Sequence, residues 1–245
     1  MTNYERAESL LVFVHIPKTA GSSVNKSLEG LGCGISHFEN FLATKDRSSL
    51  RSVLAGKQWV SGHVPYPEFT KVLDELHVDS KLMFLTAIRN PLDQVRSHYN
   101  WLVEIYFKGR QFYDGHPENI KEISSVIRSS NRSSAKSLIE NLEKYRGLFL
   151  NIQYACTVGS FRLLSKGDLK SWLCKNYSYV ATEHSLPFML QKIGLEPKLL
   201  ERQNVSRYHF DPSVFENPEV LEFLSEHNKL DQLLYDSVAE GFECC

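Results

Sequence analysis

The sequence predicts a three-layer α/β fold, in which helices flank a central sheet that is mainly parallel. Two observations predict it: apolar, β-branched runs typical of buried parallel strands, and segments of helical spacing between those runs. The first run spans residues 10–16 and is closed by Pro17. Further strands are expected at 59–61, 81–88 and 177–181. Strands that alternate with helices in this way are typical of a parallel sheet.

The first helix is expected soon after the first strand. Val24, Leu28 and Leu31 are spaced i, i+4 and i+7, so they share one face of a helix. Ser22 or Ser23 comes just before this stripe and can cap the helix.

The second helix start is the clearest in the chain. Asn90 is a good N-cap residue and Pro91 suits the first helical position, and an apolar stripe from Leu92 to Tyr106 follows them. Later helices are expected at 118–128, at 135–146, within 166–175 and at 186–193, then a loop through 197–212 and two closing helices.

Length and composition predict one globular domain. The chain has 245 residues, of which 42% are hydrophobic and 23% charged, enough for a single core. We therefore expect one domain over residues 1–245, with a helical insertion around 104–150.

The charge balance excludes several classes of partner. With 28 basic and 29 acidic residues, the whole chain attracts neither nucleic acid nor an anionic membrane, so any anion site has to be local. No apolar run approaches the roughly 20 residues of a membrane span. Five cysteines without a C-x-x-C pair fit a reducing compartment, and we expect a cytoplasmic protein.

The loop after the first strand is the candidate functional segment. A turn from a buried strand into a helix gathers backbone N–H groups and the positive end of a helix dipole. Gly21 allows close backbone approach, Ser22 and Ser23 add hydroxyl donors, and Lys18 adds a mobile charge. The loop therefore predicts a phosphate site. The alternative is an ordinary β–α turn with a surface lysine.

This loop differs from the G-x-x-x-x-G-K-[ST] loop of nucleotidases. Lys18 precedes the turn instead of closing it, and Arg89 ends the third strand where an aspartate that holds Mg²⁺ would be expected. The pattern favours a site without metal.

Residues 13–23, FVHIPKTAGSS, resemble the 5′-phosphosulfate-binding loop of carbohydrate sulfotransferases, in the group of the heparan sulfate 2-O- and 6-O-sulfotransferases. Four further segments resemble that family in the same order. They are Ser61-Gly62-His63-Val64, Ile88-Arg89-Asn90-Pro91 with Ser97-His98-Tyr99 after it, Asn151-Ile152-Gln153, and Val180-Ala181-Thr182-Glu183. The resemblance implies a P-loop-like fold that uses 3′-phosphoadenosine 5′-phosphosulfate (PAPS) as sulfate donor, without metal.

The resemblance also implies an acceptor and an origin. The acceptor would be a hydroxyl of a sugar, a glycolipid or a small molecule, with the insertion on the acceptor side. The Ala20-Gly21 pair departs from the animal Golgi enzymes, which favours a bacterial or other cytoplasmic relative.

Two residues are the candidates for catalysis. Lys18 would stabilise charge on the bridging oxygen, with a simple ground-state phosphate clamp as the alternative. His63 is the first choice for the base that takes the acceptor proton, because a neutral imidazole is competent near pH 7. His15 is its rival, which we interpret as a buried, hydrogen-bonded support of the loop. A solvated surface histidine is the remaining alternative for His63.

Other residues are candidates for holding the cofactor. The 5′-phosphosulfate would be bound by the loop, that is by Lys18, Thr19, Ala20, Gly21, Ser22 and Ser23. Arg89 and Ser97 would bind the 3′-phosphate, although Arg89 has a salt bridge with Asp93 as its alternative role. Residues that would close over the nucleotide are Thr182, Arg202, Ser206, Arg207 and Tyr208.

Two other functions stay open at this point. A small-molecule kinase would need ATP and Mg²⁺, and the missing lysine and aspartate signatures argue against it. A nucleotide-binding module that has lost catalysis would still keep the phosphate loop.

Overall fold

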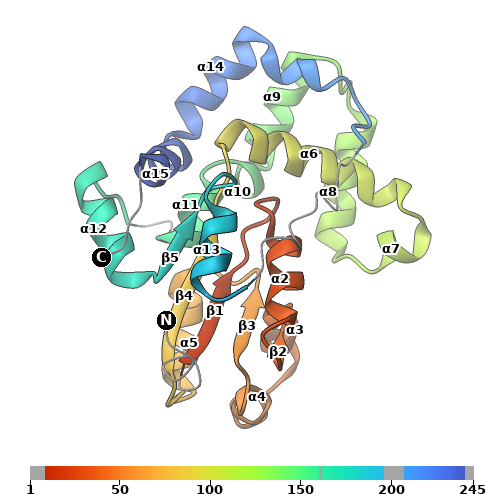
Figure 1. Ribbon diagram of the computed structural model, residues 1–245. Helices are drawn as coiled ribbons and strands as arrows, with labels where there is room; N and C mark the ends of the chain where they lie inside the picture. Colours follow the sequence, from red (N-terminus) through yellow and green to blue (C-terminus); the bar gives the residue numbers. More distant parts are fainter. Residues whose placement is uncertain (1–8, 160–161, 196–206, 241–245) are drawn as a thin grey trace. The chain divides into compact units, whose positions relative to one another are not determined.

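The computed structural model describes residues 9–159, 162–195 and 207–240 of the chain (Figure 1). The described residues belong to two compact units. The sheet unit is drawn from Met1–Arg89, Gln153–Gln203 and Leu233–Cys245, and the helical unit from Asn90–Ile152 and Asn204–Gln232.

The sheet unit is built on five parallel strands in the order β2-β3-β1-β4-β5. The predicted strands are confirmed as β1 (Ser9–Val14), β3 (Trp59–Gly62), β4 (Lys81–Ala87) and β5 (Tyr179–Ala181). The strand that the sequence did not reveal is β2, Gly34–Ile35, which is only two residues long. β1 is buried along its whole length, as expected of a central strand.

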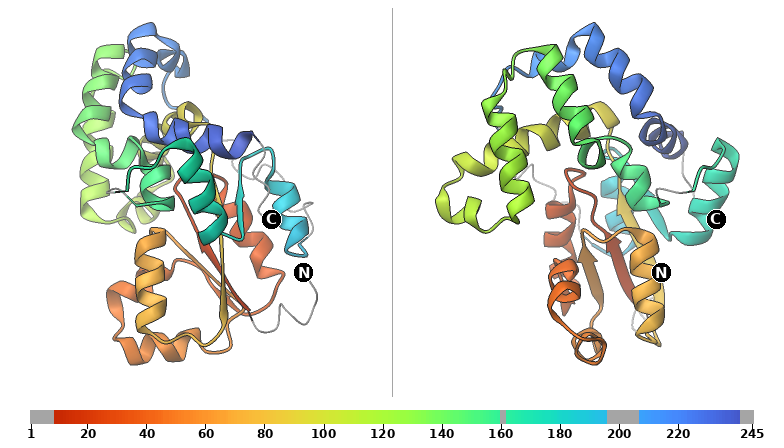
Figure 2. Two further views of the ribbon diagram at one scale, coloured as in Figure 1. Left: turned by 90° about the vertical axis from the view of Figure 1, so that its left-hand side faces the viewer. Right: turned by 180° about the vertical axis from the view of Figure 1, so that it is seen from behind.

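Helices cover both faces of this sheet (Figure 2). On one face α2 (Gly21–Glu29) and α13 (Leu186–Lys192) share a core with β1 that includes Phe13, Val24 and Leu190. On the other face α5 (Tyr66–Glu75) and α12 (Lys166–Asn176) meet, because the Tyr66 ring lies 4.7 Å from Phe84 and 5.3 Å from Trp172. The predicted three-layer, P-loop-like α/β fold is thus confirmed. The remaining helices of this unit are α3 (Phe38–Thr44), α4 (Arg47–Leu54) and α11 (Ile152–Thr157).

The helical unit begins at the strong helix start. The Asn90 side chain accepts hydrogen bonds from the backbone of Leu92 (3.1 Å) and Asp93 (3.3 Å), and α6 runs from there over Pro91–Phe107. Tyr99 and Phe149 are buried in the core of this unit. Its other elements are α7 (Arg110–Asp114), α8 (Glu118–Ser129), α9 (Ala135–Lys144), α10 (Arg146–Phe149), the 3-10 helix η2 (Pro212–Glu216) and α14 (Pro218–His227), while α15 (Lys229–Ala239) crosses into the sheet unit.

The insertion predicted around 104–150 lies within this helical unit, which begins earlier, at Asn90. Across the described ranges, no helix is both long and apolar enough to cross a membrane.

Candidate functional site

Three neighbouring strands lead into three of the sequence-predicted segments. His63 follows β3, the loop predicted to bind phosphate (residues 18–23, which we call the phosphate loop) follows β1, and Arg89 follows β4. Because the strands are parallel, their carboxyl ends share one edge of the sheet. The chain places β2 and β3 on one side of β1, and β4 and β5 on the other. This edge is therefore a topological switch point, where open α/β sheets bind their ligands.

The phosphate loop turns into α2 through two residues in the left-handed region. Lys18 has φ 67° and Ala20 has φ 74°. Ala20 is the N-cap residue, and its carbonyl accepts from the backbone of Ser23 (3.0 Å) and Val24 (3.1 Å). The expectation that Ser22 or Ser23 caps the helix is wrong, because the turn at Ala20 starts the helix at Gly21.

The early helix start leaves α2 without a side-chain cap. The side chain of alanine has no oxygen that can accept from the first turn, so the backbone N–H groups of Gly21 and Ser22 and the positive end of the helix dipole are offered to an anion. Ser22 is exposed and Ser23 is half-buried, so both hydroxyls are within the first turn and accessible. Thr19 is buried, and its hydroxyl donates to the Ile16 carbonyl at 3.0 Å, so this side chain braces the loop.

Gly21 is required by close packing. A Cβ atom at this position would lie 1.8 Å from both Cδ2 and Nε2 of His15. The imidazole of His15 therefore fills the space beside the first residue of α2, and the loop keeps this shape only with glycine there.

His63 has a defined orientation. Its Nδ1 lies 2.8 Å from the His15 carbonyl oxygen, which can only accept a hydrogen bond, so Nδ1 carries the hydrogen. In the neutral ring the lone pair is then on Nε2. The backbone N–H of His63 donates to Oε2 of Glu39 at 2.9 Å, and the rings of His63 and His15 are 4.1 Å apart.

The surroundings favour the neutral form of both imidazoles. Desolvation lowers the pKa of His63 below its usual 6.5, while the Glu39 charge and the hydrogen bond to the His15 carbonyl act in the opposite direction. The pKa of His15 is lowered much further by burial, and next by the neighbouring His63. His63 still reaches the surface, whereas His15 is only 8% exposed.

His15 differs from the sequence-based expectation in two ways. It lies just beyond β1 rather than on it, although its backbone N–H still donates to the Gly62 carbonyl at 3.0 Å. Its ring Nδ1 is buried and has no hydrogen-bond partner among the described residues, so the expected hydrogen-bonded side chain is wrong for this atom. His15 supports the site through its carbonyl, which accepts from His63, and through its ring, which fills the space beside Gly21.

Arg89 is held by its backbone. Its N–H donates to Oε1 of Gln153 (2.8 Å), and its carbonyl accepts from Nε2 of the same side chain (2.9 Å). Gln153 is almost wholly buried, which explains the role of the Asn151-Ile152-Gln153 segment. Asp93, the alternative partner of Arg89, pairs with Arg96 one turn along α6.

The remaining predicted contacts belong to both units. Ser97 is half-buried on α6, in the helical unit. The Thr182 backbone N–H donates to Oγ of Ser185 (2.9 Å) at the turn before α13, so this segment shapes a helix start. In the helical unit, Tyr208 has its ring 6.0 Å from the Arg96 guanidinium. Arg207 is exposed, and Arg202 and Ser206 lie outside the described residues.

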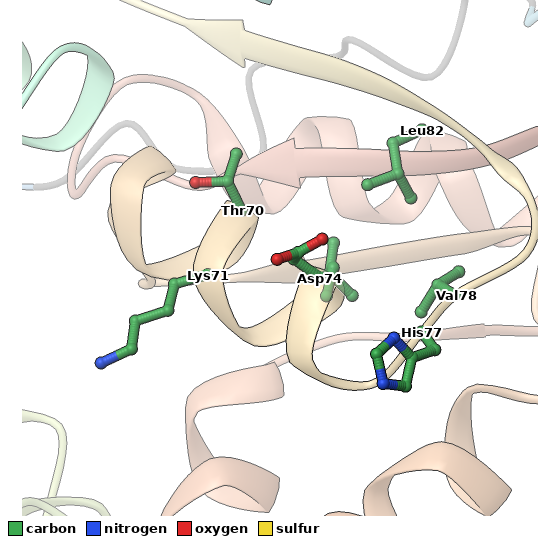
Figure 3. A pocket seen from close by; sticks show the side chains of 7 residues that line it. Thr70, Lys71, Asp74, His77, Val78 and Leu82 are labelled. Atoms are coloured by element: carbon green, nitrogen blue, oxygen red, sulfur yellow. The ribbon is translucent and has the colours of Figure 1, made fainter.

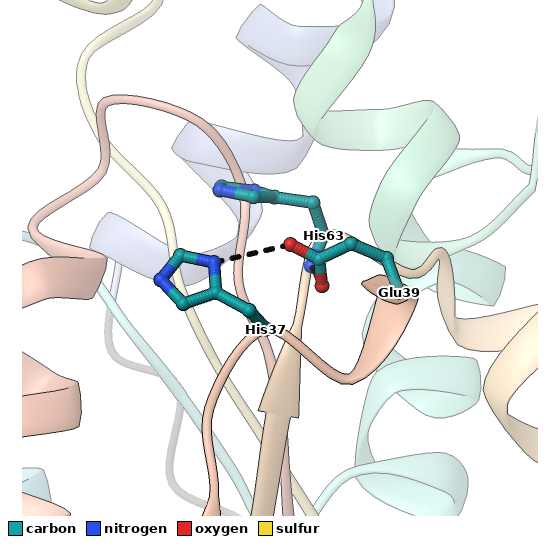
Figure 4. Close-up of side chains that lie close together, drawn as sticks. All are labelled: His37, Glu39 and His63. Carbon is teal, nitrogen blue, oxygen red and sulfur yellow. Dashed lines mark hydrogen bonds and ion pairs between the residues drawn. The ribbon is translucent and has the colours of Figure 1, made fainter. Parts of the chain in front are cut away.

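Two residues of the site, Glu39 and His37, were not predicted from the sequence. Glu39 contacts the His63 backbone and also lies 3.2 Å from Nδ1 of His37 through its Oε1 (Figure 4). Both residues follow β2, and a strand of two residues gives no periodic signal that could have located them.

A separate pocket lies away from these residues. Thr70, Lys71 and Asp74 of α5 line it together with His77, Val78 and Leu82 (Figure 3). Leu82 is at the amino end of β4, opposite to the sheet edge at which the phosphate loop opens. This pocket takes no part in the predicted site.

The described residues thus define a parallel α/β fold with a candidate anion-binding loop after its central strand. No family model matches the chain, and no curated protein matches it. Among known structures, mouse sulfotransferase SULT7A1 complexed with PAP is similar at 12% sequence identity and a TM-score of 0.36, over 96% of this chain and 86% of that one. The case for a function rests on the residues of the site.

Proposed function

We propose that the chain is a cytoplasmic sulfotransferase, which moves a sulfuryl group from PAPS to a hydroxyl of a sugar, a glycolipid or a small molecule. One observation carries the proposal: the uncapped start of α2, with Lys18 before it, opens at the same sheet edge as His63, whose Nε2 is the basic nitrogen. The resemblance of residues 13–23 to the phosphosulfate loop of carbohydrate sulfotransferases supports the same assignment.

The residues at the sheet edge suit a nucleotide with two phosphate positions. The first turn of α2, with Ser22 and Ser23, offers backbone and hydroxyl donors, and Lys18 adds a cation. The ring of the buried His15 lies beside this turn, with Cδ2 and Nε2 facing Gly21. Arg89 offers a planar donor fork from the next strand, and we assign it, with Ser97, to the 3′-phosphate.

PAPS, when bound, supplies an activated sulfuryl group on a phosphate leaving group. In the proposed reaction Nε2 of His63 takes the proton of the acceptor hydroxyl. Meanwhile the Nδ1–H of His63 remains hydrogen-bonded to the His15 carbonyl. The acceptor oxygen forms a bond to sulfur as the bond from sulfur to the bridging oxygen breaks in line with it. Lys18 stabilises the negative charge that this oxygen gains. No step calls for a metal ion.

The test is transfer of labelled sulfate from PAPS to a panel of glycans and small hydroxyl compounds, at saturating nucleotide. His63→Ala is expected to lower kcat by about 10² to 10⁴ and to leave nucleotide affinity nearly unchanged. His63→Asn is the sharper variant, because its amide can still donate to the His15 carbonyl but cannot act as a base. Lys18→Ala should lower kcat and also weaken nucleotide binding.

Four results would go against the proposal or against its choice of base. If His63→Asn kept the wild-type kcat, His63 would not be the base. If only His15→Asn lost activity, His15 would be the base instead. Phosphoryl transfer from ATP with Mg²⁺ would instead establish the kinase alternative. Nucleotide binding with no transfer to any acceptor would favour a module without catalysis.

A further inference from the structure

His37, Glu39 and His63 form a cluster of metal-binding side chains at the edge of the sheet unit. One ligand atom from each lies within 4.8 Å of the others (Figure 4). Nδ1 of His37 and Oε1 of Glu39 are 3.2 Å apart. Ligand atoms in a tetrahedral site with bonds of about 2.0 to 2.1 Å stand roughly 3.4 Å apart, so this pair already has the spacing of two zinc ligands.

The chemistry of the cluster selects the kind of ion. Two imidazoles and one carboxylate form a set that Zn²⁺ takes in open sites, where water completes the coordination. Imidazole nitrogen favours zinc and its transition-metal neighbours over Mg²⁺ or Ca²⁺, which prefer oxygen ligands. The side chain of His37 is 56% exposed, so an ion in solution can reach the cluster.

The surrounding hydrogen bonds are those of a supported metal site. Ligating histidines commonly donate their second ring N–H to a carbonyl, and the Nδ1–H of His63 does so to His15 at 2.8 Å. This leaves Nε2 of His63 as its metal-binding atom. Oε2 of Glu39 is fixed by the His63 backbone at 2.9 Å, which holds the carboxylate between the two histidines.

We propose that His37, Glu39 and His63 bind a single Zn²⁺ ion, which takes the place of the proton between His37 and Glu39. The consequence rests on the proposed function: an ion on Nε2 of His63 occupies the lone pair that takes the acceptor proton. Zinc is therefore an inhibitor of the transfer reaction, which itself needs no metal. Inhibition is reversed by a chelator.

The experiment is calorimetric titration of ZnCl₂ into the full chain, with any purification tag removed and no chelating buffer. One zinc per chain is expected for the wild type, with no heat from MgCl₂. His37→Ala and Glu39→Gln should each weaken zinc binding at least about tenfold, because each removes a direct ligand. His184→Ala is the matched control, since His184 is exposed and lies 4.0 Å from a carboxylate oxygen of Glu183.

Each outcome decides between site and function. Absence of zinc binding overturns the site. So does zinc binding that is unchanged in His37→Ala, which would place the ion on the exposed thiols of Cys33 or Cys174. Zinc binding without any sulfate transfer supports the site while the proposed function fails. Full activity with zinc bound overturns the inhibitory role. Inhibition over the concentration range of binding, weakened in His37→Ala, supports both.

Discussion

At the scale of single residues, the paired histidines make stability depend on pH. The pKa of His15 lies well below 6.5 in the folded chain, mainly because of its burial. As the pH falls, the unfolded chain therefore takes up this proton before the folded chain does. The contribution of His15 to the free energy of unfolding is complete above about pH 6.5. It is lost as the pH falls toward the pKa of His15 in the folded chain, by up to about 1.4 kcal/mol per pH unit.

The measurement is the free energy of unfolding in urea at several pH values from 7.5 to 5. His15→Asn is expected to flatten the decline, whereas His184→Asn, at an exposed histidine, should leave it unchanged. An equal slope in wild type and His15→Asn would contradict the assignment.

The same reasoning applies to the reaction. An unperturbed imidazole would place the rise of the rate near pH 6 to 7, but desolvation lowers the pKa of His63. The rate is therefore expected to rise with pH through an inflection below 6.5 and then to level off, as measured in pH profiles of kcat/KM for the acceptor. A rate that falls as the pH rises through this range would mean that a protonated group is needed instead.

Arg89 allows binding to be separated from folding. The hydrogen bonds described for it are made by its backbone to Gln153, and alanine keeps them. Arg89→Ala is expected to weaken binding of 3′-phosphoadenosine 5′-phosphate by roughly 1.5 to 3 kcal/mol, the range of a charged hydrogen bond, with little change in stability. Calorimetry measures the affinity, and Arg51→Ala, at an exposed position of α4, removes an equal charge as the control. Unchanged affinity would mean that residues other than Arg89 bind the 3′-phosphate.

At the scale of elements, the start of α2 depends on the contact between Gly21 and His15. A methyl group at Gly21 would overlap the imidazole, at 1.8 Å from two of its atoms. Gly21→Ala is therefore expected to destabilise the chain by about 1 to 3 kcal/mol in urea unfolding, the usual cost of overpacking. Weaker nucleotide binding should accompany it, because the loop has to shift.

Gly167→Ala provides the matched control. It lies in α12, and its added Cβ would meet no atom within 4 Å. There the substitution should be neutral or stabilising, by up to about 1 kcal/mol, because alanine favours a helix over glycine. Equal losses in the two variants would show that the space beside His15 is not what requires glycine.

The elements also show what the sequence can and cannot specify. Four strands and the cap at Asn90 were predictable, because long apolar runs and an Asn-Pro pair act locally. The left-handed Ala20 was not, because alanine rarely adopts that conformation and tertiary packing imposes it. The role of Glu39 was not predictable from the sequence either. Its contact with His63 spans 24 positions and forms only when β2 joins the sheet.

At the scale of the whole molecule, the near-neutral chain has to attract an anion locally. The net charge is −1, so in the proposed function the loop after β1 and Arg89 after β4 supply the field that binds the nucleotide. A ligand with phosphates at both positions gains from both, whereas AMP lacks the 3′-phosphate.

Thermal unfolding with different nucleotides tests this expectation. At 100 times its Kd, a ligand of the folded state stabilises it by about 2.7 kcal/mol. For a chain of this size each kcal/mol raises Tm by about 2 to 4 °C. At equal concentrations, 3′-phosphoadenosine 5′-phosphate should therefore raise Tm far more than AMP or ATP, and Arg89→Ala should remove most of the difference from AMP. A larger shift with ATP and Mg²⁺ would mean that the site is built for a metal-bound triphosphate, and the sulfotransferase assignment would give way to the kinase.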